Sequence, residues 1–167
     1  MEVKLRLEKA RPEDAEAMLI VHRAAIRGTA AAYYDPDIID AWAPLPLRPD
    51  HIDALARRIE SGEEEAIVAR GRGGVIVGFG SFVPGGRELR AIYVVPDHGR
   101  LGIGAALLRE LEIRARKYGL SELIMDATLN AEAFYTRHGF TAVRRGESVL
   151  RGGRRMACIR MRKPLKR

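Results

Sequence analysis

VVPDHGRLGIGAALL, residues 94–108, decides the fold of this chain. A hydrophobic run stops at Pro96, a glycine-rich loop follows, and an Ala/Leu-rich segment typical of a helix begins at once. The free backbone N–H groups at a helix N-terminus, together with the positive end of the helix dipole, form a site for phosphate. Glycines let the backbone come close to such a ligand. The stretch therefore predicts a strand, a loop and a helix that together hold a pyrophosphate.

Two other phosphate-binding motifs do not fit the residues of this loop. A dinucleotide fingerprint, G-x-G-x-x-G, needs a third glycine where Leu107 stands, and it should open the first strand–turn–helix unit of the chain. A P-loop needs a lysine after the second glycine, where Ala105 stands. The remaining alternative to a phosphate site is that Gly102 and Gly104 only allow a tight turn and close packing of the helix on the sheet. The loop alone leaves these two interpretations open.

The segments on either side of this loop show patterns typical of helices in some places and of strands in others. Val3, Leu5 and Leu7 alternate with polar residues and predict a first strand. Helices are expected over residues 12–27, from Asp35 through Trp42, over 51–60, from the glycine loop to Tyr118, and over 131–137. Further strands are expected over residues 66–69, 75–83, 88–95, 123–127, 140–149 and 155–162. Glycine turns after residues 69 and 83 favour three successive antiparallel strands.

Composition excludes several classes of protein. Cys158 is the one cysteine, which excludes an internal disulfide framework, and no Cys/His spacing suits a structural zinc, so we expect no metal. The N-terminus does not resemble a signal peptide, and no apolar run approaches the ~18 residues of a membrane span. We therefore expect a single cytoplasmic domain over residues 1–167, with no membrane partner.

A second group of residues follows the strand expected at 123–127. Asn130, Phe134, Tyr135, Gly139 and Phe140 have the spacing N-x-x-x-F-Y-x-x-x-G-F. Together with residues 94–108, this segment resembles the GCN5-related N-acetyltransferase (GNAT) superfamily, whose members transfer an acetyl group from acetyl-CoA to an amine. The resemblance follows the order of elements over residues 3–163, and its specific motifs lie within residues 88–140.

The resemblance implies an α/β (α+β) fold. A mixed, mostly antiparallel central sheet of about seven strands carries helices on both faces. The fourth and fifth strands, here about residues 88–95 and 123–127, splay apart and admit the pantetheine arm of the cofactor.

The resemblance also implies a set of cofactor-binding residues. The family's pyrophosphate loop, [QR]-x-x-G-x-[GA], falls on Gly99, Arg100, Leu101, Gly102, Ile103 and Gly104, so that Gly99 stands where Gln or Arg is expected. Backbone N–H groups, that of Gly99 included, are expected to bind the phosphates, with Arg100 or His98 adding charge. The remaining implied contacts to acetyl-CoA are the backbone of Ile92, Val94 and Val95, then Ala105, Asn130, Phe134 and Tyr135.

Two side chains are implied to take part in catalysis. Tyr135 matches the family tyrosine that protonates the departing CoA thiolate, although it could instead simply pack beside Phe134. Glu88 is the carboxylate of the fourth strand, from which many members accept the amine proton, but a surface ion pair with Arg87 or Arg90 is an equal alternative. Asn130 either bonds the cofactor arm, caps the helix that follows, or does both.

The acceptor pocket is implied to lie among the N-terminal helices and the last hairpin. Tyr33, Tyr34, Asp40 and Trp42 are the expected lining residues, with ordinary packing of a proline-bounded loop as the alternative. The leading function is acetyl transfer to a primary amine: a small molecule, a peptide N-terminus or a lysine. The alternative is a CoA-binding sensor or interaction module without catalysis, contacting nucleic acid through its basic C-terminal hairpin.

The net charge of +7 is concentrated near the C-terminal end. Between residues 144 and 167, Glu147 is the one acidic residue among the basic residues Arg144, Arg145, Arg151, Arg154, Arg155, Arg160, Arg162, Lys163, Lys166 and Arg167. Such an excess is most often a solvated face, and no stacking aromatics are interleaved with it, so we do not expect a nucleic-acid partner. An acidic acceptor, the 3′-phosphate of CoA and a homodimer interface remain open as its partners.

Overall fold

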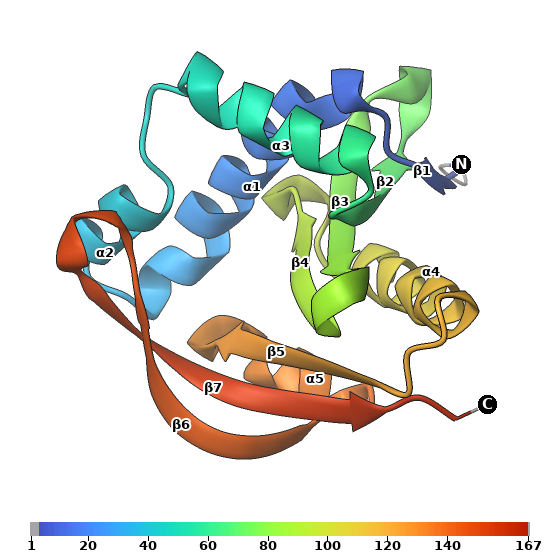
Figure 1. Ribbon diagram of the computed structural model, residues 1–167. Helices are drawn as coiled ribbons and strands as arrows, with labels where there is room; N and C mark the ends of the chain where they lie inside the picture. Colours follow the sequence, from blue (N-terminus) through green and yellow to red (C-terminus); the bar gives the residue numbers. More distant parts are fainter. Residues whose placement is uncertain (1–3, 167) are drawn as a thin grey trace.

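The computed structural model describes residues 4–166, which form a seven-stranded sheet in the order β1-β2-β3-β4-β5-β7-β6 (Figure 1). The strands are β1 (Arg6–Lys9), β2 (Glu65–Arg70), β3 (Ile76–Val83), β4 (Glu88–Val94), β5 (Glu122–Thr128), β6 (Thr141–Val149) and β7 (Arg155–Pro164). All neighbouring strands are antiparallel except β4 and β5, which are parallel. The mixed, mostly antiparallel sheet predicted from the sequence is therefore confirmed.

Helices cover both faces of the sheet (Figure 1). They are α1 (Ala15–Thr29), α2 (Pro36–Trp42), α3 (Pro49–Ser61), α4 (Ile103–Lys117) and α5 (Glu132–Arg137). The period-two alternation of β2 explains the two layers, since Ile67 and Ala69 pack towards α4 whereas Ala66 and Val68 pack towards α1 and α3. A chain with a core on each face of one sheet needs helices on both, as predicted.

The parallel pair β4–β5 is joined at only one end. Glu88 is paired with Ile124, and the Ile124 N–H donates to the carbonyl of Arg87 at 2.9 Å. Beyond this pair the two strands separate towards Val94 and Thr128. The predicted splay is thus present, and it leaves a gap in the middle of the sheet (Figure 1).

Several element boundaries differ from the expected ones by a turn or less. Residues 12–14 form a 3-10 turn, and α1 begins only at Ala15 because the Asp14 carboxylate accepts the N–H of Arg11 and a hydrogen bond from Arg70. α1 also continues through Gly28, which does not adopt a positive φ. The start of α2 at Pro36 after Asp35 is as predicted. Val3 lies outside the described residues, and among residues 4–166 no helix is long and apolar enough to cross a membrane.

Candidate active site

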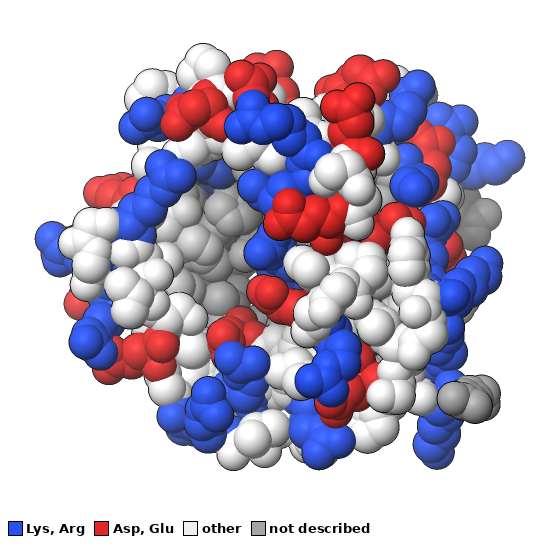
Figure 2. Space-filling model, in the orientation of Figure 1, with Lys and Arg blue, Asp and Glu red and all other residues white. Residues whose placement is uncertain are grey.

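Two cavities meet at the gap between β4 and β5. The loop cavity, of about 480 Å³, lies between the glycine loop and α5, and its lining includes His98, Gly99, Arg100, Gly102, Ile103, Gly104, Ala105, Phe134, Arg137 and His138. The inner cavity, of about 110 Å³, lies on the opposite side of the gap, and its lining includes Ala25, Ile26, Ala30, Trp42, Arg90, Ala91, Tyr93, Met125, Asp126 and Thr128. Both cavities are lined by Thr29, Ile92, Val94, Asn130, Ala131 and Tyr135. The shared residues place the two cavities next to each other at the gap, and Figure 2 shows the hollow that opens among α1, α2 and β4.

The glycine loop folds into a cradle for an anion. Arg100 and Gly102 both have positive φ, and Gly102 directly precedes α4. Helix geometry leaves the first N–H groups of α4 without intrahelical acceptors, so they face the loop cavity together with the positive end of the dipole. A Cβ at Gly104 would lie 3.4 Å from two ring atoms of Phe134, which means that a larger side chain there would fill the cradle.

One expectation about this loop is wrong. The N–H of Gly99 donates to the carbonyl of Pro96 at 3.1 Å, so it is not free to bind a phosphate, although Gly99 does line the cavity. The proline turn that ends β4 uses this N–H internally. Leu101 is 65% exposed and does not line the loop cavity, so phosphate binding would depend on the start of α4.

The backbone of β4 presents polar groups to the gap. The N–H of Val95 donates to Val77 of β3 at 2.9 Å. Because backbone groups alternate in direction along a strand, those of Ile92 and Val94 point the other way, towards the gap. No part of β5 pairs with them there. The structure therefore offers Ile92 and Val94 to an extended ligand, whereas Val95, also expected to bind the cofactor, lines neither cavity.

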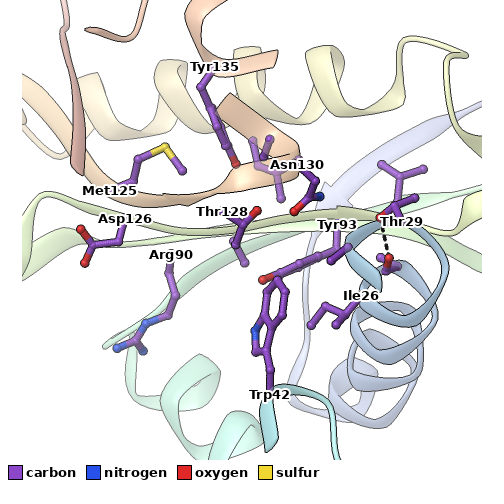
Figure 3. Close-up of a pocket in the computed structure, with 16 residues that line it drawn as sticks. Ile26, Thr29, Trp42, Arg90, Tyr93, Met125, Asp126, Thr128, Asn130 and Tyr135 are labelled. Carbon is purple, nitrogen blue, oxygen red and sulfur yellow. Dashed lines mark hydrogen bonds between the residues drawn. The ribbon is translucent and has the colours of Figure 1, made fainter. Parts of the chain in front are cut away.

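Four polar side chains converge on the gap from different elements (Figure 3). They are Tyr93 from β4, Thr128 from the end of β5, Asn130 from the turn after it, and Tyr135 from α5. The Oδ1 atom of Asn130 is buried and has no hydrogen-bond partner within residues 4–166. An orphaned buried acceptor is costly, so its position fits a ligand that donates a hydrogen bond, as an amide of a pantetheine arm would.

Tyr135 and Tyr93 are both held protonated. Tyr135 is 4% exposed, and burial, followed by the nearby Tyr93 hydroxyl, raises the pKa of its phenol. Burial, followed by Tyr34, likewise raises the pKa of Tyr93. The ring of Tyr135 packs edge-on against Phe134 and Phe140, which fixes its direction. At neutral pH each hydroxyl can therefore donate a proton or a hydrogen bond into the gap.

The four residues expected to line an acceptor pocket have different positions. Trp42 lines the inner cavity. Tyr33 is 55% exposed, and Asp40 is an exposed carboxylate paired with Arg27 at 3.0 Å. Tyr34 is buried, where its hydroxyl donates to the carbonyl of Ala157 at 2.7 Å and accepts the N–H of Leu129 at 2.8 Å. The structure brings only Trp42 of this set to the cavity.

Glu88 is also distant from the convergence of polar side chains. It lies at the joined end of β4 and β5, is exposed, and has Arg90 at 3.9 Å. The carboxylate that lines the inner cavity is Asp126 on β5, which pairs with Arg160 at 2.8 Å. Asp126 interrupts the apolar run of β5, a signal that could have indicated it, whereas Tyr93 stands inside the apolar run of β4; neither was predicted.

Comparison with known proteins agrees with this geometry. A family model described as an acetyltransferase (GNAT) domain matches residues 38–165. A crystal structure described as a GCN5-related N-acetyltransferase, "Aminotransferase, Class-II", from Rhodopseudomonas palustris is 30% identical, covers 99% of both chains and superposes with a TM-score of 0.85.

Two further relatives extend the similarity. The uncharacterized N-acetyltransferase YafP of Escherichia coli K12 is 28% identical over 152 residues, which are 89% of each chain. The PaiA N-acetyltransferase of Thermoplasma acidophilum, solved in complex with coenzyme A, is 22% identical, covers 96% of this chain and 99% of its own, and has a TM-score of 0.76. At that level of identity the second match supports the fold alone.

Proposed function

Because the chain belongs to the GNAT family of acetyltransferases, we propose that it transfers the acetyl group of acetyl-CoA to the nitrogen of an amine. The observation that carries the proposal is the pair of neighbouring cavities at the gap, one with an anion cradle and the other polar and partly aromatic. Two substrates, one in each cavity, would meet at the residues that both cavities share. Holding them there makes the reaction effectively unimolecular.

The loop cavity supplies the contacts that acetyl-CoA requires. The first N–H groups of α4 bind the pyrophosphate, with Arg100 and His98 at the rim. The backbone of Ile92 and Val94 and the Oδ1 atom of Asn130 bond the pantetheine arm in the gap. These contacts direct the thioester towards Tyr135 and the inner cavity.

The residues around the gap can complete the chemistry. As the amine nitrogen forms a bond to the acetyl carbon, the bond between that carbon and sulfur breaks, and the sulfur receives a proton from the Tyr135 hydroxyl. The amine loses its proton through water to Asp126, which lines the cavity where Glu88 does not. The Arg160 guanidinium holds the Asp126 carboxylate in place. The inner cavity, at about 110 Å³, suits a small amine or one extended chain such as a lysine or a peptide N-terminus.

Release of free CoA from acetyl-CoA, measured with a thiol reagent over a panel of amines and peptides, tests the proposal. Tyr135→Phe should lower kcat by about 10²-fold, since a general acid contributes that much or more, with unchanged affinity for CoA. Tyr33→Phe, at an exposed tyrosine away from both cavities, is the matched control and should retain full activity. Full activity in Tyr135→Phe would make this tyrosine structural. CoA binding without transfer to any amine would instead favour a sensor or interaction module.

A further inference from the structure

A third cavity adjoins the inner cavity on the far side of Trp42. This arginine cavity, of about 390 Å³, is lined by Leu19, Arg23, Ala41, Trp42, Pro44, His51, Ala54, Arg58, Val149, Leu150 and Arg151. It lies where α1, α3 and the turn between β6 and β7 meet. Its lining contains three arginines and a histidine and no carboxylate.

Arg23 is the unusual member of this lining. It is 7% exposed, and no carboxylate oxygen of residues 4–166 lies within 4.0 Å of its guanidinium. Its contacts are the carbonyl of Pro44, at 3.4 Å from Nε, and Nδ1 of His22, at 3.1 Å. A buried charge is expensive unless an opposite charge or several good hydrogen bonds accompany it.

Other arginines near the core of this protein do have acidic partners. Arg70 pairs with Glu8 and Asp14, and Arg58 pairs with the buried Glu64 at 3.0 Å. By contrast, burial followed by the charge of Arg27 lowers the pKa of Arg23, and no acid opposes this. Among residues 4–166, Arg23 combines a buried guanidinium with the absence of an acidic partner, and it lines a cavity.

Arg151 and His51 also line this cavity. Arg151, on the turn between β6 and β7, bonds Nε2 of His51 on α3 at 2.7 Å. Burial, then Arg151, lowers the pKa of His51; Asp50 opposes this lowering, and Arg23 adds to it. The nearest acid in sequence, Asp50, is exposed and pairs with Arg48 at 3.0 Å. Arg23 and Arg151 thus present positive charge to one cavity from two separate parts of the chain.

The arginine cavity and the inner cavity follow one another along the same side of α1. Leu19 and Arg23 line the first, and Ile26 and Ala30 line the second. These positions are spaced i, i+4, i+7 and i+11, which places them on one helix face. With a rise of 1.5 Å per residue, Arg23 and Ala30 are about 10 Å apart along the axis.

We propose that the arginine cavity binds the carboxylate or phosphate group of the acceptor, so that the acceptor is an amine carrying an anionic group about 10 Å from its nitrogen. This inference rests on the proposed acetyl transfer and deepens it. Arg23 and Arg151 hold the anionic end, Trp42 packs along the chain between the two ends, and the nitrogen reaches the gap beside Tyr135. The contact satisfies the charge of Arg23, which the protein leaves without an acidic partner.

Matched acceptors test this assignment. 8-Aminooctanoic acid and its primary amide have the same length and differ in one negative charge. The acid should have a kcat/KM at least about tenfold higher than that of the amide, because a charge-assisted hydrogen bond provides that much. Arg151→Gln should lower the ratio severalfold, because only Arg23 then holds the anionic group. Arg144→Gln removes an exposed charge on β6 outside the cavity and should leave the ratio unchanged.

Arg151 is the deciding position because Arg23 also holds Pro44 and His22, so that a change at Arg23 can disturb folding. Equal rates with acid and amide in the wild-type enzyme would overturn the inference while leaving acetyl transfer intact. A preference for the acid that is undiminished in Arg151→Gln would also overturn it.

A measurement with inorganic phosphate tells whether the arginine cavity binds a free anion or the anionic group of the acceptor. Phosphate should raise the Tm of the wild-type protein more than that of Arg151→Gln, and should compete with 8-aminooctanoic acid. Stabilisation by phosphate without any preference for the acid would show a site for a free anion and refute the acceptor assignment. The phosphate measurement needs no turnover, so a failure of acetyl transfer with every amine remains distinguishable from a failure of the anion site.

Discussion

Gly104→Val should separate folding from cofactor binding. A Cβ at this position lies 3.4 Å from Cε2 and Cζ of Phe134 and 3.9 Å from Cγ2 of Ile92, which is ordinary van der Waals contact. The two further methyl groups of valine must therefore either press on Phe134 or project into the loop cavity. Either outcome narrows the space between α4 and α5 where the pyrophosphate is proposed to bind.

The magnitude follows from the contacts that are lost. Displacing the phosphate from one N–H at the start of α4 removes a hydrogen bond to a charged group, which contributes about 1.5–3 kcal/mol. At 1.4 kcal/mol per factor of ten, the Kd for CoA should rise roughly 10- to 100-fold. Gly104→Ala is the matched control, because its methyl group fits and alanine favours a helix by up to about 1 kcal/mol over glycine.

Calorimetric titration with CoA and thermal unfolding measure the two effects. Gly104→Ala should keep the wild-type Kd and raise Tm by about 1–4 °C, whereas Gly104→Val should lose affinity while remaining folded. A folded Gly104→Val that binds CoA as tightly as the wild type would refute our account of the loop.

Three further outcomes are expected. Asp126→Asn should lower kcat/KM near neutral pH, and the kcat/KM of this variant should recover as pH rises, because the amine then loses its proton to solvent without help. A pH profile of kcat/KM parallel to that of the wild type would exclude Asp126 as proton acceptor. The second outcome concerns Asp14. Burial acts to raise the pKa of its carboxyl, but the N–H of Arg11 and the guanidinium of Arg70 outweigh burial and lower that pKa in the folded state. Its stabilisation is therefore present above the unfolded-state value of 3.8 and lost as pH falls through the lower folded-state pKa. Asp14→Asn should cost about 1–2 kcal/mol in urea unfolding at pH 7, and equal costs at pH 7 and in strong acid would contradict this. Tyr34→Phe leaves the buried carbonyl of Ala157 and the N–H of Leu129 without their phenol partner and should cost about 1–3 kcal/mol, whereas an unchanged Tm would show that water replaces it.

Local signals in the sequence predicted most of the fold correctly. The start of α2 follows from Asp35 and Pro36, and the end of α3 follows from Gly62, whose φ is +78°. The sheet order could not come from periodicity, because an alternating strand does not identify its neighbours. The resemblance carried by residues 94–108 and 130–140 implied the mixed sheet with splayed fourth and fifth strands, but the full strand order was not predicted.

The candidate site was less predictable than the fold. Tyr34 precedes α2 and Trp42 ends it, and nothing in their spacing tells which ring enters the core and which lines a cavity. Glu88 and Asp126 are both carboxylates on neighbouring strands, and only the register of β4 with β5 separates the joined end from the open end. No sequence pattern singles out Arg23, because helical periodicity contains no information about the loop that covers it.

The separation of β4 from β5 makes the lifetime of this protein depend on the supply of its own substrate. Beyond Glu88, the backbone groups that β4 turns towards the gap have no strand to bond. A ligand that bonds them adds to the free energy of unfolding, by about 2.7 kcal/mol when its concentration is 100 times its Kd. Proteases act on transiently opened chains, so a cell rich in acetyl-CoA should degrade this protein slowly, and starvation for acetyl groups should shorten its half-life.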